Sequence, residues 1–271
     1  LSRFRVNTYR QRGSLAAVIR VIAFELPDPG ILNIPEDVMS VSDFTKGMVL
    51  VTGPAGSGKS TTMACIVDRI NHSREGHIIT LEDPLEYLHR HDKCIVSQRE
   101  ICTDTESYLV SLRATLRQSP DVILLGEMRD YETIQTAMTA AETGHLILSS
   151  LHTTGAANTI GRIVDVFEPA QQRQISIQLS MVLQAVISQQ LIPDINGHTI
   201  PAFEVMRLNP AIRNMIRDNK VHQIDGVIAS SAHEHMRSMD QSLLELYKQN
   251  KITKETALKF ASNADMLKRK L

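Results

Sequence analysis

One glycine-rich segment constrains the fold of this 271-residue chain more than any other feature. Residues 53–60 read Gly-Pro-Ala-Gly-Ser-Gly-Lys-Ser, with the spacing G-x-x-x-x-G-K-S. An apolar run at 48–51 precedes the segment, and residues 62–67 can continue as a helix. In this setting the loop turns its backbone N–H groups inward, and the helix start adds a positive dipole end. The segment therefore predicts a phosphate-binding loop; a glycine-rich turn that binds nothing is the alternative.

Each position of this loop has an expected role toward ATP and Mg²⁺. Lys59 is expected to reach the β- and γ-phosphates, because that is the role of the lysine in such loops. The Ser60 hydroxyl is expected to hold Mg²⁺. The other predicted nucleotide-binding positions of the loop are Gly53, Pro54, Ala55, Gly56, Ser57, Gly58 and Thr61.

The composition narrows the class of protein. The formal net charge is −1, and aromatic residues make up 4% of the chain without any Trp, so neither a basic nucleic-acid footprint nor base-stacking platforms are indicated. The three cysteines form no C-x-x-C pair, which argues against a zinc site and a disulfide framework. No apolar stretch reaches the ~18 residues of a membrane span. No signal peptide opens the chain. It starts at Leu1 rather than Met, which suggests that it belongs to a longer protein.

Strand and helix patterns alternate from Lys46 onward. Such alternation predicts a mainly parallel sheet with helices on its faces, and ligands then bind at the carboxyl ends of the strands. The expected strands are 48–52, 77–81, 121–126 and 145–151. The expected helices are 60–69, 108–117, 131–143 and 156–166.

The segments before and after this core have other residue patterns. The first 26 residues suggest a strand, a helix over 15–21 capped by Ser14, and an apolar strand over 22–26, too little to form a core alone. Residues 171–190 have apolar residues at helical spacing, and further helices are expected at 210–217, 238–249 and 254–271. The expected domains are the end of an N-terminal domain (1–27), a linker (28–45), an ATPase core (46–200) and a helical C-terminal region (201–271).

Two acidic segments follow predicted strands. Glu82, Asp83 and Glu86 lie within five residues after an apolar strand, a placement that suits a Mg²⁺–water–phosphate site; a charged surface turn is the alternative. Glu127 follows the apolar run 122–125, as in a Walker B motif, where the carboxylate holds the water shell of the metal or orients the attacking water. Glu82 and Glu127 are thus expected to hold the metal through water.

Histidines and arginines supply further candidates. His145 and His152 bracket a predicted strand seven residues apart, so they lie at opposite ends and on opposite faces, and a shared metal site is not expected. His152 lies at the carboxyl end, where it can sense the γ-phosphate, whereas His145 is expected to be structural or to lie at a subunit boundary. Arginines stabilise the charge that develops in phosphoryl transfer. The candidates are Arg3, Arg5, Arg20, Arg113, Arg117 and Arg162.

Taken together, these segments resemble the secretion-type hexameric ATPases over nearly the whole chain. The phosphate loop, the acidic box 80–86, the Walker B segment 126–130 and the histidine box 143–154 occur in the order and at the spacing of that family. Segment 211–217 (Ala-Ile-Arg-Asn-Met-Ile-Arg) looks like the C-terminal motif of its type IV pilus-retraction branch, and residues 3–7 resemble the end of the N-terminal PAS-like domain of that branch. A tetracysteine zinc insertion, usual in the extension and type II secretion branches, is absent. Ala55 and Leu85 depart from the usual Thr and Ile.

The resemblance implies a RecA-like P-loop core with a mainly parallel sheet, in a cytoplasmic homohexamer at the inner face of the membrane. ATP would bind between this core and the N-terminal domain, with Arg3, Arg5 and Arg20 near the nucleotide. Glu86 and Glu127 are the two acids that could activate water, and the sequence does not decide between them. His152 would couple the γ-phosphate to domain motion, and Arg162 could serve the subunit contact. Segment 211–217 would transmit motion to the platform protein of the pilus in the inner membrane.

The sequence thus predicts a Mg²⁺-dependent ATPase that drives pilus retraction. A traffic ATPase of a secretion system is the nearest alternative, because only the partner would differ. A RecA-like DNA translocase is disfavoured by the charge and the scarce aromatics, and no nucleic-acid partner is expected. A non-catalytic nucleotide-binding scaffold would not need the acidic residues at 82–86 and 127.

Overall fold

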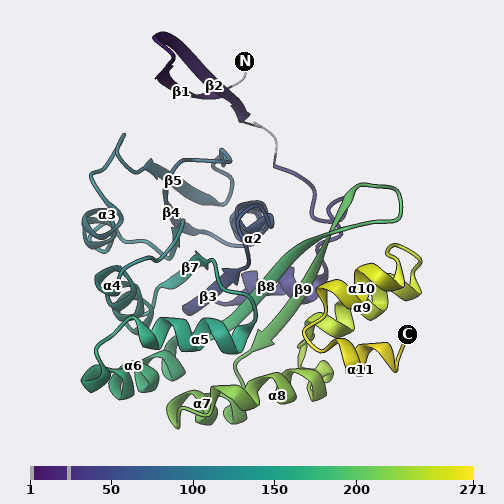
Figure 1. Cartoon of the computed structure of the whole chain (residues 1–271). Helices are drawn as coiled ribbons and strands as arrows, with labels where there is room; N and C mark the ends of the chain where they lie inside the picture. The colour runs from purple at the N-terminus through teal and green to yellow at the C-terminus, as the bar shows by residue number, and fades with distance from the viewer. Residues whose placement is uncertain (1–2, 23–25) are drawn as a thin grey trace.

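A seven-stranded sheet forms the centre of the computed structural model, which describes residues 3–22 and 26–271 (Figure 1). The strand order is β5-β4-β6-β7-β3-β8-β9, and all neighbouring pairs are parallel except β8 and β9. The mainly parallel α/β fold predicted from the alternating pattern is therefore confirmed. The strands are β3 (Gly47–Thr52), β4 (Gly76–Glu82), β5 (Cys94–Glu100), β6 (Val122–Leu125), β7 (Leu146–Leu151), β8 (Leu183–Pro193) and β9 (Thr199–Arg207).

Apolar side chains on both faces of the sheet are buried under helices. Along β3, Met48 and Leu50 face one cluster, whereas Val49 and Val51 face the other, because side chains alternate along a strand. The first cluster includes residues of α3 to α8, and the second includes residues of α1 and α2. These helices are α1 (Glu36–Met39), α2 (Lys59–Ser73), α3 (Tyr108–Thr115), α4 (Tyr131–Glu142), α5 (Ala156–Asp165), α6 (Pro169–Val182), α7 (Pro210–Arg217) and α8 (Ile224–Ser230).

The four predicted strands and four predicted helices of the core are confirmed with end shifts of a few residues. Strand β5 was not foreseen, since its apolar residues are few and it forms the edge of the sheet. None of the helices in the described residues is long and apolar enough to cross a bilayer.

The N-terminal segment differs from its prediction. Residues 3–22 form a hairpin of β1 (Arg3–Gln11) and β2 (Ser14–Ile22), so the helix expected over 15–21 is wrong. Arg12 and Gly13 both have positive φ values, which suits the tight turn of a two-residue hairpin, and β2 is rich in β-branched residues. Most of the strand expected over 22–26 falls on residues outside the described ones.

The segment 171–190 is a helix only in its first half. Helix α6 ends at Val182, and β8 begins at Leu183 without an intervening turn. The apolar residues of this segment are spaced as in a helix, but pairing of β8 with both β3 and β9 decides for a strand. Strand β9 then carries the sheet to Arg207, seven residues past the boundary expected for the core.

The C-terminal region packs as a third cluster against the ends of β8 and β9. It contains α9 (Met239–Lys248), α10 (Lys254–Phe260) and α11 (Ala264–Lys268). The single helix expected over 254–271 is therefore wrong. The chain turns at Ala261 to Asn263, where both carboxylate oxygens of Asp240 accept backbone N–H groups.

The segment expected as a linker, residues 28–45, is docked on the core. Val38, Met39 and Val41 are buried, and the guanidinium of Arg69 on α2 donates to both carboxylate oxygens of Glu36 at 2.8 and 2.6 Å. The segment 28–45 is thus tied to the helix that starts at the phosphate loop.

Candidate nucleotide-binding site

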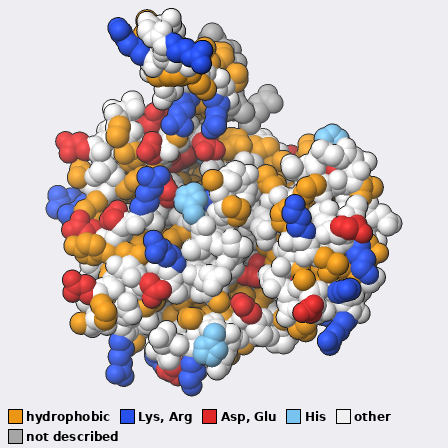
Figure 2. All heavy atoms as spheres, in the orientation of Figure 1, with side chains coloured by type: hydrophobic (Ala, Val, Ile, Leu, Met, Phe, Trp, Pro, Cys, Tyr) orange, Lys and Arg blue, Asp and Glu red, His pale blue; other side chains and the backbone are white. Residues whose placement is uncertain are grey.

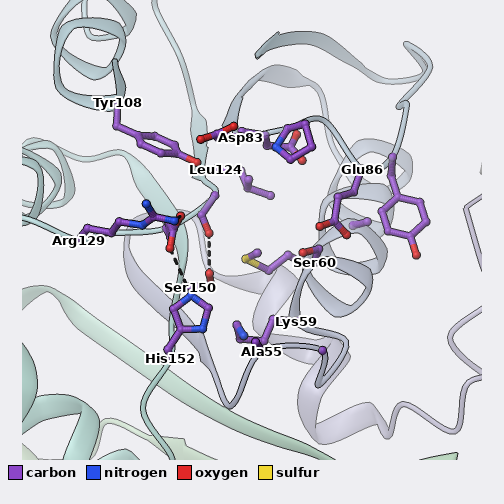
Figure 3. A pocket seen from close by; sticks show the side chains of 18 of the residues that line it. Ala55, Lys59, Ser60, Asp83, Glu86, Tyr108, Leu124, Arg129, Ser150 and His152 are labelled. Atoms are coloured by element: carbon purple, nitrogen blue, oxygen red, sulfur yellow. Dashed lines mark hydrogen bonds and ion pairs between the residues drawn. The ribbon is translucent and has the colours of Figure 1, made fainter. Parts of the chain in front are cut away.

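A cavity of about 260 Å³ lies at the carboxyl ends of β3, β4, β6 and β7. Close up, Ser60 and Glu86 lie on one side, Arg129 and His152 lie on the other, and Lys59 lies between them (Figure 3). The structure therefore brings residues from four separate sequence motifs into one site. The predicted site residues that line it are Ala55, Gly56, Lys59, Ser60, Glu82, Glu86, Glu127 and His152.

The remaining loop residues shape the turn rather than line the cavity; they are Gly53, Pro54, Ser57, Gly58 and Thr61. Gly53 has φ +144°, and a Cβ there would lie 2.2 Å from the backbone oxygen of Gln189. Gly58 has φ +86°, and its Cβ would lie 2.9 Å from the Gln189 side-chain nitrogen. At both positions the conformation and the close neighbour require glycine.

Gln189 of β8 is a site residue that sequence reasoning missed. Its side chain is 3% exposed, and its Oε1 accepts a hydrogen bond of 2.7 Å from Thr62 Oγ1 on α2. It therefore packs beneath the phosphate loop and fixes the loop against the start of α2. No local motif marks it, because β8 lies far along the chain and meets β3 only in the folded sheet.

Lys59 is held in place by the loop itself. Its Nζ donates to the backbone oxygens of Gly53 at 2.9 Å and Pro54 at 3.0 Å, and the residue is 8% exposed. Burial lowers the pKa of Lys59, while the charges of Glu127 and Glu86 act in the opposite direction. An ammonium group is thus positioned at the mouth of a loop lined by backbone N–H groups, as triphosphate binding requires.

The acidic segment at the end of β4 contains one largely buried carboxylate, Glu82, and two exposed ones, Asp83 and Glu86. Burial raises the pKa of Glu82 to about 7, although Thr80 Oγ1 donates to its Oε1 at 2.7 Å. Glu86 is exposed and lines the same cavity; its backbone N–H donates to the Glu82 carboxylate, while its own carboxylate has no hydrogen bond or ion pair from the described residues. Tyr87 Oη lies 2.8 Å from Thr61 Oγ1, so the segment is anchored to the first turn of α2.

Glu127 contacts two neighbouring side chains, Arg129 and His152. It forms an ion pair with Arg129, and His152 Nε2 lies 3.3 Å from its Oε2. The Glu127 side chain is only 11% exposed. Gly126 before it has no room for a side chain, because a Cβ would lie 2.7 Å from Tyr108 Oη. Arg129 was part of the Walker B segment, yet its contact with Glu127 was not foreseen.

The predicted arginines are not in this cavity. Arg5 and Arg20, paired across the hairpin, line a neighbouring cavity of about 180 Å³ together with Pro84, Glu86 and Tyr87. Figure 2 shows basic side chains of the hairpin directly above acidic side chains of the core. Arg3 lies in β1, and its side chain is outside the described ones. Arg113 and Arg117, at the end of α3, do not line the site; His145 lies at the opposite end of β7, where its Nδ1 is 2.9 Å from Ala140 O.

The residues present fit a Mg²⁺ ion that shares its coordination with a nucleotide. Ser60, Glu82 and Glu127 offer hydroxyl and carboxylate oxygens to one cavity, and Mg²⁺ prefers oxygen ligands while keeping several waters. No cluster of three or more His, Cys, Asp or Glu side chains among the described residues forms an all-protein metal site. Mg²⁺ at this place would therefore depend on phosphate oxygens and water.

Comparison with known proteins is consistent with this geometry. Among curated relatives, the type IV pilus retraction ATPase PilT of Pseudomonas aeruginosa is 46% identical over 95% of this chain and 75% of its own length. A twitching motility protein of Neisseria gonorrhoeae is 44% identical over 98% of this chain and 72% of its own.

Solved structures agree with the curated relatives. The pilus retraction motor PilT with bound ADP has a TM-score of 0.92 at 48% identity, covering 98% of this chain and 76% of that one. The ATPase DotB of Legionella pneumophila has a TM-score of 0.80 at 25% identity, covering 94% and 71%. The family model described as "Type II/IV secretion system protein" matches residues 3–269. The chain belongs to the type II/IV secretion system protein family.

Proposed function

We propose that this chain is the ATPase subunit of a hexameric motor that retracts a type IV pilus. The motor would lie in the cytoplasm, at the inner face of the membrane. The relatives named for pilus retraction and twitching motility match 95% and 98% of this chain, whereas the type II secretion proteins of similar identity match only 54% and 56% of it. One observation carries the enzymatic part: Lys59, held by the phosphate loop, shares one cavity with the carboxylates of Glu86 and Glu127.

The loop and Lys59 would bind the triphosphate. Phosphate oxygens are stronger acceptors for an ammonium group than the Gly53 and Pro54 carbonyls, so Lys59 would transfer its hydrogen bonds to the β- and γ-phosphates. Ser60, with Glu82 and Glu127 through water, would hold Mg²⁺, which neutralises charge on the phosphates when bound.

The two acids would have different roles. A group that positions water needs a free oxygen, and the Glu86 carboxylate has no hydrogen bond or ion pair in the described residues, whereas the Glu127 carboxylate is already in contact with Arg129 and His152. We therefore assign water activation to Glu86. Glu127 would orient the water shell of the metal, and His152 would carry a change at Glu127 to β7. Arg5 and Arg20, which line the cavity beside Glu86, would approach the phosphates when the hairpin closes on the core.

Substitution of Lys59 tests the proposal. Lys59→Ala removes the charge that holds the β- and γ-phosphates, so ATP turnover should fall to background while the circular dichroism spectrum stays that of the wild type. Lys254→Ala, on the first turn of α10, is the matched control and should retain activity. Hydrolysis by Lys59→Ala at the wild-type rate would end the ATPase proposal.

The motor part needs separate measurements. The mass of the assembly with ATP and Mg²⁺ should correspond to six subunits. Capture of the pilus platform protein from native membranes would favour retraction, and capture of a secretion-system platform would favour the traffic ATPase alternative. An ATPase rate that rises on addition of DNA would instead support a translocase.

A further inference from the structure

A second cavity adjoins the nucleotide cavity on the far side of Glu127. It has a volume of about 550 Å³ and lies among the end of β7, the start of α4 and helix α5. Glu127, Arg129, Ser150 and His152 line both cavities. The wall between them therefore consists of side chains rather than backbone elements, and its centre is the pair of contacts from Glu127 to Arg129 and His152.

The second cavity has an excess of positive charge. Arg129 and Arg162 both line it, and Glu127 is the one acidic residue among its lining residues in the described chain. Arg129 already compensates Glu127, whereas Arg162 on α5 has no hydrogen bond or ion pair within the described residues. An unpaired guanidinium beside a solvent-filled space is suited to an oxyanion, because its planar fork matches phosphate geometry.

The second cavity lies where a product of ATP hydrolysis could leave the nucleotide cavity. The reaction leaves ADP in the phosphate loop and frees inorganic phosphate into the same cavity, which Glu127 and His152 also line. While ADP fills the loop, the phosphate needs another route. The wall formed by Glu127, Arg129 and His152 offers one, since these side chains can exchange partners without movement of the sheet.

From this arrangement we propose that the second cavity receives the inorganic phosphate released by hydrolysis, with Arg162 as its counter-ion. The proposal rests on the proposed ATPase function. Phosphate would meet Arg129 and His152 at the shared wall and then Arg162 within the cavity. Release of phosphate would thereby break the contacts of Glu127, which links product exit to β7 and α5.

Product inhibition by inorganic phosphate tests this assignment. In the assembled full chain, Arg162→Gln should raise the inhibition constant of phosphate about tenfold, which corresponds to about 1.4 kcal/mol. The inhibition constant of ADP should stay within about twofold, since Arg162 does not line the nucleotide cavity. Arg173→Gln, an exposed arginine on α6, is the matched control and should change neither constant.

Two results would overturn the proposal: an unchanged phosphate constant in Arg162→Gln, or a parallel loss of phosphate and ADP affinity. If Arg162→Gln does not assemble, Arg162→Lys keeps the charge but loses the fork, and a rise of about threefold is then expected. If the wild-type protein does not hydrolyse ATP, the proposed function fails. Calorimetric titration of phosphate into the ADP-loaded protein still decides whether the cavity binds it.

Discussion

The two sides of the nucleotide cavity are built in opposite ways. The phosphate loop is determined by backbone: its glycines have positive φ, and Gly53 and Gly58 have no space for a side chain above the buried Gln189. The acidic part of the site depends instead on side chains. Glu86 is exposed, and Glu127 is in contact with Arg129 and His152, which can change partners. Binding requires a rigid cradle, whereas hydrolysis and motion require groups that can rearrange. Substitutions should therefore act on different quantities on the two sides.

The largest effect is expected on the acidic side. Glu86→Gln should lower kcat by about a hundred- to ten-thousand-fold, the range for loss of a general base, with little change in KM for ATP. Glu127→Gln should instead raise the Mg²⁺ concentration needed for half-maximal activity, because its carboxylate is assigned to the metal's water shell. Steady-state kinetics over a range of Mg²⁺ concentrations separates the two.

The two variants control for each other, since both replace a carboxylate with an amide of equal size. The reverse result, a kcat loss confined to Glu127→Gln with Glu86→Gln close to wild type, would assign water activation to Glu127. It would also remove the distinction drawn here between a free and a paired carboxylate.

Sequence motifs predict the parts of this site whose structure depends on residues close together in the chain. The phosphate loop, the acids at the ends of β4 and β6 and the position of His152 follow from motif spacing and from the parallel sheet, which brings the carboxyl ends of its strands together. Gln189 and the contact between Arg129 and Glu127 did not follow, because they depend on which strands become neighbours and on side-chain packing. The same limit explains β8, for which a helix is predicted: pairing with β3, far along the chain, decides its conformation. Strand β2 differs, because its partner β1 is adjacent in sequence and the turn at Arg12 and Gly13 joins them.

A smaller effect is expected at Glu82, the buried carboxylate of the acidic side. Burial raises its pKa from the ordinary value of 4.5 to about 7, so the folded protein holds a proton that the unfolded chain releases. Its contribution to stability is therefore present at low pH and is lost as pH rises from about 4.5 to about 7. The loss is on the order of 2 to 3 kcal/mol.

Urea unfolding without nucleotide at several pH values checks this prediction. Glu82→Gln should become more stable relative to wild type between about pH 5 and pH 8, and Glu75→Gln, at an exposed position, should show no such trend. The buried His89, whose pKa is lowered to about 4, weakens stability at acid pH in both proteins, so it cancels in the difference. A constant difference across the range would show that Glu82 is ionised in the folded protein.

The smallest effect is expected beneath the phosphate loop. Gln189→Leu keeps an apolar filling of similar length but leaves the buried hydroxyl of Thr62 without its acceptor, at a cost of about 1 to 3 kcal/mol in the free energy of unfolding. The double variant with Thr62→Val removes both partners and should recover most of that loss. Because the cradle binds ground state and transition state alike, Gln189→Leu should raise KM for ATP and leave kcat nearly unchanged. A fall in kcat without a change in KM would mean that the loop side also takes part in the rearrangements of hydrolysis, and the division between a rigid and an adaptable side would not hold.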